Sequence, residues 1–132
     1  MQTLVLVLAC VKLVFASYAD AQFSFVPNVG SWSNGRTQCQ ARGGDLASIH
    51  SAAEDSAARA PVPSGSSAWI GLSDSTTEGS YVWVDETPLD YINWAGGEPN
   101  GGGGENCGGF YKGHSSGWAD GNYEGGYWNF TW

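Results

Sequence analysis

The spacing of apolar residues predicts a helix over residues 32–42. Trp32, Gly35 and Cys39 recur at three- and four-residue intervals, as expected for the buried face of a helix. Gly43 follows, and glycine commonly stands just past a helix end.

A second helix is predicted to begin after Ser51. The Ser51 side chain can cap it, and Glu54 stands three residues later, as in a capping box. Alanines favour helix through this segment, and Pro61 stops it. The short stretch 45–49 then bridges the two helices.

Beyond Pro63 the pattern changes to short apolar runs that predict strands. Residues 68–72 are a buried-strand candidate and 81–84 are a second, with a turn at 76–79 between them. Three further runs predict strands at 109–111, 117–118 and 127–132. Two helices followed by several antiparallel strands predict an α+β fold.

Regular pattern fades after Leu89, and residues 96–109 are rich in glycine. A flexible linker would share that glycine content, but this stretch also carries oxygen-bearing side chains and a cysteine. A long ordered loop of this kind usually carries function.

Residues 1–21 are predicted to be a signal peptide that is cleaved before Gln22. Residues 3–16 are apolar except for Lys12, and this run is too short to span a bilayer comfortably. The following sequence Ala19-Asp20-Ala21 supplies the small residues that suit signal peptidase. Residues 22–132 then form one domain that is secreted and extracellular, with no membrane insertion.

The chain is acidic, with 13 acidic and 5 basic residues and a net charge of −8. This balance disfavours nucleic acid and anionic membranes as partners, because both demand basic patches. It suits a protein that gathers carboxylates around a hard cation.

Cysteine usage leaves several arrangements open. Cys10 lies in the predicted signal peptide, which leaves Cys39 and Cys107 in the domain. These two can pair with each other, stay free or pair between chains, and the sequence does not choose among the three. Pairing between chains would make an oligomer.

Short motifs along the chain form one ordered series. They are Ser31-Trp32-Ser33, Cys39, Gly44-Asp45-Leu46-Ala47-Ser48-Ile49, Glu54, Trp69-Ile70-Gly71-Leu72, Asn93-Trp94, Glu98-Pro99-Asn100, Glu105-Asn106-Cys107 and Trp118-Ala119-Asp120. Each motif alone is weak, but in this order and near this spacing they resemble the C-type lectin-like family across almost the whole domain. The resemblance implies two helices flanking short antiparallel sheets, paired termini, a long calcium-binding loop and a core strand at Trp69-Ile70-Gly71-Leu72.

The resemblance also implies two missing disulfides. Cys39 matches the family's first helix cysteine, and Thr131 stands roughly where its partner belongs. Cys107 matches the loop cysteine, and Tyr123 stands in place of its partner.

Oxygen-bearing side chains in and after the loop suit a calcium ion, which prefers carboxylate, amide and carbonyl oxygens. Glu98 and Asn100 flank Pro99, and a cis bond before the proline would turn both side chains to one side. Glu105 and Asp120 supply two more carboxylates. These four ligands are the predicted principal calcium site.

A sugar is predicted to bind at the same ion. Two adjacent hydroxyls can replace water on calcium while each donates to a carboxylate and accepts from an amide N–H. In the family, glutamate-proline-asparagine in this order accompanies mannose-type ligands: mannose, N-acetylglucosamine, fucose and glucose. The resemblance therefore implies a lectin for mannose-type glycans, which suits innate recognition of microbial glycans. The predicted sugar contacts are Glu98, Asn100, Glu105, Asp120 and Asn122.

An accessory calcium site is also implied by the resemblance. Asp74 and Glu78 match its carboxylates, Asn106 lies nearby, and Glu105 would be shared with the principal site. Gly101 stands where the family has a further aspartate. The alternative interpretation of Asp74 and Glu78 is a solvated turn.

No enzyme is predicted. The two histidines, His50 and His114, lack the spacing of zinc ligands, and no serine or cysteine lies in a nucleophile motif. His50 precedes a helix cap and is interpreted as structural or solvent-facing. A competing hypothesis is a calcium-independent protein- or surface-binding module of the same fold with a decayed sugar site. It rests on the missing cysteines and on Ala119, which stands where the family has an asparagine ligand.

Overall fold

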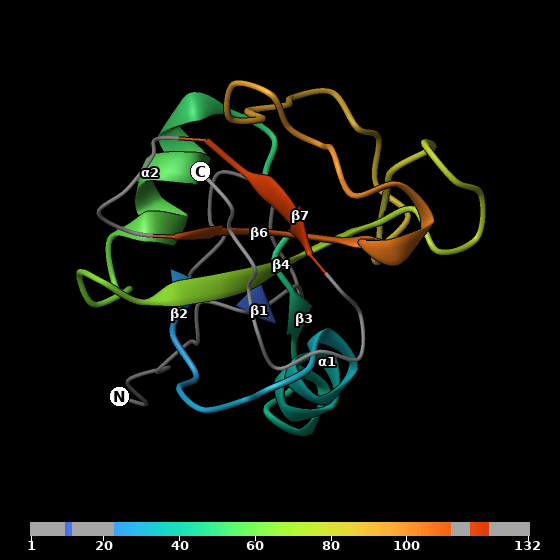
Figure 1. Cartoon of the computed structure of the whole chain (residues 1–132). Helices are drawn as coiled ribbons and strands as arrows, with labels where there is room; N and C mark the ends of the chain where they lie inside the picture. The colour runs from blue at the N-terminus through green and yellow to red at the C-terminus, as the bar shows by residue number, and fades with distance from the viewer. Residues whose placement is uncertain (1–9, 12–22, 112–116, 122–132) are drawn as a thin grey trace, which may run out of the picture.

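A computed structural model describes residues 10–11, 23–111 and 117–121. Its elements in chain order are β1 (Cys10–Val11), β2 (Phe23–Ser24), α1 (Trp32–Ala41), β3 (Asp45–Leu46), α2 (Ala52–Arg59), β4 (Ser67–Ser73), β5 (Val82–Trp83), the 3-10 turn η2 (Gly102–Gly104), β6 (Cys107–Tyr111) and β7 (Ala119–Gly121). Figure 1 shows the two helices lying apart with the strands between them. The predicted α+β class is confirmed.

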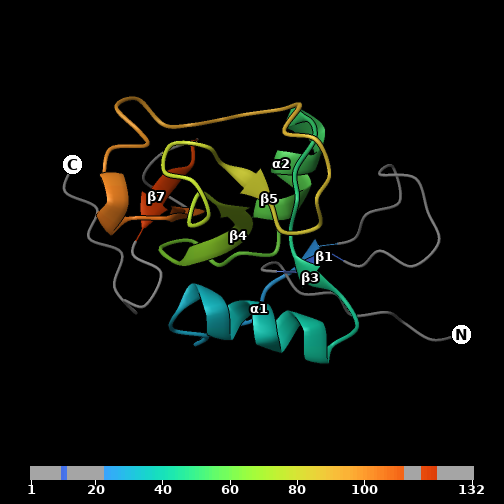
Figure 2. The same cartoon turned by 90° about the vertical axis from the view of Figure 1, so that its right-hand side faces the viewer.

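The strands form two antiparallel sheets. The small sheet has the order β2-β1-β3, and the larger one has the order β5-β4-β6-β7. Within the larger sheet, Gly108 of β6 stands opposite Asp120 of β7. Figures 1 and 2 show the yellow-to-orange loop that follows β5 lying on the side of this sheet away from α1. The larger sheet therefore carries Asp120 to the loop side of the molecule.

Both helices begin as the sequence predicted. The Ser31 side chain caps α1 by accepting from Asn34 N, and Ser51 caps α2 by accepting from Glu54 N. Glu54 Oε2 in turn accepts from the backbone N–H of His50 at 2.7 Å, one residue before the cap. The capping box is thus reciprocal, with its return bond shifted by one residue.

The strand β4 carries the core. Its residues Ala68, Ile70 and Leu72 are buried in one apolar cluster, and Trp69 is buried in a second cluster on the opposite face. This alternation is the period of a strand that is covered on both faces. A Cβ on Gly71 would lie 2.8 Å from Leu46 O, so this position admits only glycine. The predicted core role of the Trp69-Ile70-Gly71-Leu72 strand is confirmed.

Some strand boundaries differ from the prediction. β6 begins at Cys107, two residues before the expected start, and β7 begins at Ala119, after the expected strand at 117–118. Glycines and a cysteine extend β6 because its backbone pairs with β4 whatever its side chains are. The predicted strand 127–132 lies outside the described residues.

The strand β1 was not predicted. It lies between β2 and β3 and is antiparallel to both, inside the stretch 1–21. Cleavage before Gln22 would remove it from the small sheet. The signal peptide stays a prediction. Within the described residues, no helix has the length and apolar content needed to cross a membrane.

The cysteines are not equivalent. Cys39 is disulfide-bonded, which corrects the expectation that it lacks a partner. Cys107 is free and buried, so Cys39 and Cys107 do not pair with each other. Burial raises the pKa of the Cys107 thiol to about 12, which keeps it protonated and unreactive.

Candidate functional site

The start of the long loop is held against the strand region that ends in β7. Ala95 N donates to Trp118 O at 2.8 Å, and Trp118 N donates to Asn93 O at 2.6 Å. A Cβ on Gly117 would lie 2.4 Å from Ala95 N, so glycine is required for this close approach. The two segments, distant in sequence, are thereby brought side by side.

Asp120 fixes the next part of the loop. It is 5% exposed, and its Oδ1 and Oδ2 accept from the backbone N–H groups of Asn100 at 3.0 Å and Gly101 at 2.9 Å. Asn100 Nδ2 donates to Glu98 Oε1 at 2.7 Å, and the Glu98–Pro99 peptide bond is cis. The structure therefore brings together Glu98, Asn100 and Asp120, three of the four residues predicted for the principal site.

Glu105, the fourth residue, reaches the same place from the other end of the η2 turn. Its carboxylate lies over Gly101, where an added Cβ would stand 2.1 Å from Glu105 Oε2. Burial raises the pKa of Glu105, and the charge of Asp120 raises it further. A glycine at position 101 thus leaves the space that the Glu105 side chain occupies.

The acids of this cluster oppose one another's ionisation. Burial raises the pKa of Glu98 to about 7, with further contributions from a hydrogen bond to Asp120 and from the charges of Asp120 and Glu105. We call Glu98, Asn100, Glu105 and Asp120 the loop cluster. A proton shared within it, or a cation placed in it, would relieve the repulsion.

The described residues contain no group of three acidic, histidine or cysteine side chains already arranged to hold a metal ion. The Asn100 amide donates to Glu98, and both oxygens of Asp120 accept backbone N–H groups. These hydrogen bonds stabilise the carboxylates of Glu98 and Asp120, whose like charges repel one another.

The residues of the predicted accessory site also lie together. Asp74 is 2% exposed, and its Oδ2 accepts from Gly79 N at 2.8 Å. With its nitrogen turned toward the acids, the Asn106 amide lies 3.1 Å from Asp74 Oδ1 and 3.3 Å from Glu78 Oε2. The solvated-turn interpretation is therefore wrong for Asp74, whereas Glu78 is exposed.

One pocket of about 230 Å³ joins the two acidic groups. Its lining includes Asp74 and Glu78 as well as Asn100 and Asp120. Tyr81 also lines the pocket, and burial and then the charges of Asp120, Asp74 and Glu78 raise the pKa of its hydroxyl. The Tyr81 hydroxyl donates to Glu105 O at 3.4 Å.

The sequence profile of the Lectin C-type domain matches residues 28–129. The chain belongs to the C-type lectin domain family. Over 98 residues it is 38% identical to the C-type mannose receptor 2 of Mus musculus, a match that covers 74% of this chain and 7% of that receptor. The chain thus spans a small part of the length of this relative.

Two solved structures show how the C-type lectin fold is used elsewhere. The cow carbohydrate-recognition domain of CD23, determined in the presence of a GlcNAc2Man3 oligosaccharide, is 40% identical with a TM-score of 0.64, covering 72% of this chain and 71% of that one. A calcium-independent type II antifreeze protein is 31% identical with a TM-score of 0.65, covering 70% of each chain. The family is one of binding modules and includes carbohydrate-binding domains.

Two predicted features of this C-type lectin domain have different outcomes. Asn122 lies outside the described residues, so its proposed sugar contact stays a prediction. Ala119 is 2% exposed in β7, opposite Gly109, and its methyl group brings no oxygen to the loop cluster.

Tyr81 is a pocket residue that the sequence did not single out. The sequence assigned it only to a strand. Asp74 and Glu78 are near Tyr81 in sequence, but Asp120 is far along the chain, so no local pattern marked Tyr81 as a residue that lies near both acidic groups.

Proposed function

We propose that this C-type lectin domain binds mannose-type sugars with calcium as its cofactor. The observation that carries the proposal is the loop cluster, in which Asp120 holds the backbone of Asn100 and Gly101 while Asn100 contacts Glu98. Burial and the charge of Asp120 raise the pKa of Glu98 and of Glu105, so a divalent cation would find two carboxylates that gain from its charge.

The donor set fits calcium. Glu98, Glu105 and Asp120 would supply carboxylate oxygens and Asn100 an amide oxygen, all of which are hard ligands that calcium prefers. No histidine or cysteine belongs to the proposed set, which disfavours zinc. When bound, calcium would supply coordination positions for two neighbouring sugar hydroxyls.

The residues of the loop cluster would also orient the sugar. Glu98 would accept a hydrogen bond from one sugar hydroxyl, and the Asn100 amide would donate to that hydroxyl through Nδ2. In the structure, Nδ2 donates to Glu98. An acceptor followed by a donor in this order is the arrangement that the family resemblance links to mannose-type ligands. The accessory group Asp74, Glu78 and Asn106 would hold a second ion across the shared pocket.

The comparisons support sugar binding as the class of function. The cow domain that this chain resembles was determined with an oligosaccharide containing mannose and N-acetylglucosamine. We further propose that the domain is secreted and recognises microbial glycans. Its net charge of −8 disfavours nucleic acid as a partner.

Affinity chromatography tests this proposal. The domain should be retained on mannose-agarose in calcium and released by EDTA, with galactose-agarose as the matched control. Asn100→Asp paired with Glu98→Gln reverses donor and acceptor and should shift retention from mannose to galactose. Retention on mannose that survives EDTA would refute the calcium mechanism.

A second candidate function is a calcium-independent binding module. Ala119 favours it, because that position brings no ligand oxygen, and so does the likeness to a calcium-independent antifreeze protein. Calorimetric titration separates the two. Heat from calcium binding supports the lectin, whereas no binding at millimolar calcium favours the second candidate.

A further inference from the structure

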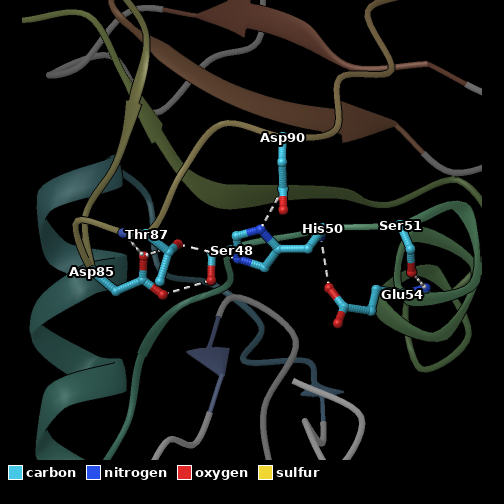
Figure 3. Close-up of polar contacts among 7 residues, drawn as sticks. All are labelled: Ser48, His50, Ser51, Glu54, Asp85, Thr87 and Asp90. Carbon is cyan, nitrogen blue, oxygen red and sulfur yellow. Dashed lines mark hydrogen bonds and ion pairs between the residues drawn. The ribbon is translucent and has the colours of Figure 1, made fainter. Parts of the chain in front are cut away.

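A chain of polar contacts ties the stem of the long loop to the segment before α2. Figure 3 shows the imidazole of His50 lying between Thr87 and Asp90, with Asp85 and Ser48 continuing the chain of contacts beyond Thr87. His50 Nδ1 lies 2.6 Å from Asp90 Oδ1, and His50 Nε2 lies 3.1 Å from Thr87 Oγ1. The His50 side chain is 6% exposed.

The hydrogen-bond donors in this network of polar contacts can be assigned starting from Asp85. Its carboxylate accepts from the Ser48 hydroxyl at 2.6 Å, from the Thr87 hydroxyl at 2.6 Å and from Thr87 N at 3.1 Å. A 2.6 Å contact is typical of a hydroxyl that donates to an ionised carboxylate. The single proton of the Thr87 hydroxyl therefore points at Asp85.

The two ring nitrogens of His50 must then both donate. Thr87 Oγ1 has no second proton, so His50 Nε2 supplies the one between them. At the other nitrogen, the Asp90 side chain is 53% exposed and its Oδ1 lies only 2.6 Å from Nδ1, a short contact typical of an ionised carboxylate that accepts from N–H. A histidine that donates from both nitrogens is an imidazolium.

The charges around His50 favour that form. Asp90 faces it from the loop, Asp85 lies one hydrogen bond further on through Thr87, and Glu54 of α2 accepts its backbone N–H at 2.7 Å. Arg59, further along α2, is paired with Asp55 at 3.0 Å. The ring of Trp83 also lies near, with its centroid 6.1 Å from that of His50.

We propose that His50 is a proton-dependent latch on the stem of the long loop, and that Thr87 relays its state to Asp85. When His50 loses a proton, Nε2 becomes an acceptor, and the Thr87 hydroxyl turns from Asp85 to His50. Asp85 then keeps two of its three donors, and the turn at residues 85–90 loosens. This segment leads into the loop that carries Glu98, so the latch makes the loop firmest when His50 is charged.

Nuclear magnetic resonance tests the latch on the full domain without calcium or sugar, so its outcome is independent of the proposed lectin activity. Where the Thr87 amide is protected from exchange, both ring nitrogens of His50 should carry protons. As the ring loses a proton at higher pH, opening at the Thr87 amide should rise about tenfold beyond the intrinsic pH effect.

Thr87→Val and Thr87→Ser form the matched pair. The valine variant lacks the relay hydroxyl and should lose the pH dependence of opening at residue 87, whereas serine should retain it. His50→Gln should lose the dependence as well, and His114→Gln, which changes the other histidine, should keep it. A neutral His50 ring beside a protected Thr87 amide at neutral pH would overturn the proposal. So would equal behaviour of the valine and serine variants.

Discussion

Asp55 and the loop cluster both hold the long loop, but their carboxylates have different neighbours. Asp55 of α2 is 4% exposed, and the chain's own donors surround it: Arg59 Nε at 3.0 Å, Trp118 Nε1 at 3.3 Å, the Tyr91 hydroxyl at 3.4 Å and Asn93 Nδ2. Two acids of the loop cluster also accept hydrogen bonds from the chain, but within the described residues no cationic side chain pairs with them, and their other neighbours are acids. There, burial raises the pKa of both Glu98 and Glu105, and the charge of Asp120 raises both further.

The difference separates structural acids from ligand acids. A buried carboxylate that pairs with a cationic side chain and accepts hydrogen bonds from several neutral donors needs no ion from solution. Carboxylates that crowd together, and whose charged forms are disfavoured, gain from a cation that comes from outside. By this criterion Asp55 anchors the loop, and the loop cluster is where an ion would bind.

The largest effect is expected from Asp55→Ala. This substitution removes the acceptor that Arg59, Trp118 and Asn93 share, and breaking a buried ion pair costs about 3–5 kcal/mol. Urea unfolding should show that loss in free energy of unfolding. Glu86→Ala, at an exposed position, is the control and should change stability little. A small loss for Asp55→Ala would mean that the loop is held mainly by other contacts.

The opposite result is expected from Glu105→Gln. In EDTA this variant should be as stable as the parent or more so, because the neutral amide no longer repels Asp120. Its calcium affinity should fall about ten- to a hundredfold, the cost of losing one charged contact. Paired urea and calorimetric measurements check both parts. Destabilisation in EDTA without loss of calcium affinity would place Glu105 with the structural acids.

The loop cluster, one side of this contrast, could be predicted from the sequence. The motifs predicted Glu98, Asn100, Glu105 and Asp120 as one site because oxygen ligands followed one another in family order. The capping box and the core strand were equally local. The sequence did not predict the partners of Asp55, because Trp118 and Asn93 meet it only through the tertiary fold.

Other features could not be predicted from the sequence for the same reason. Tyr81 joins the pocket because the antiparallel sheet places the residue just before β5 near acids of the 74–78 segment and of β7. The boundaries of β6 and β7 shifted because backbone pairing, rather than residue preference, extends strands through glycine. The hydrogen bonds of His50 likewise depend on residues far along the chain.

A smaller effect is expected from Ala119→Asn. Asparagine there would add one amide oxygen and one amide donor beside Asp120, and a hydrogen bond of about 0.5–1.5 kcal/mol corresponds to at most roughly tenfold in affinity. Titration with mannose in calcium should show sugar binding tightened by about that factor. A urea curve for the same variant would show whether the buried position accepts the larger side chain. A folded variant with no gain would mean that another residue already fills this role.

The smallest effect concerns the pH dependence of stability without calcium. The pKa of Glu98 is raised to about 7 in the folded domain, above the value of about 4.3 in an unfolded chain. Between these values the folded domain binds more protons than the unfolded chain. The contribution of Glu98 to stability is therefore full below about pH 4.3 and is lost as the pH rises through about 7.

Solvent screening at this partly exposed side chain reduces the expected loss to less than about 1 kcal/mol. Urea midpoints in EDTA should therefore fall slightly between about pH 5 and pH 8, and Glu98→Gln should flatten that dependence. Saturating calcium should flatten it too, because a bound cation would favour the ionised carboxylate that the free domain disfavours. A decline that survives both changes would have to come from another group, with His50 the first to examine. A midpoint that rises with pH in EDTA would contradict the crowding of acids that distinguishes the loop cluster from Asp55.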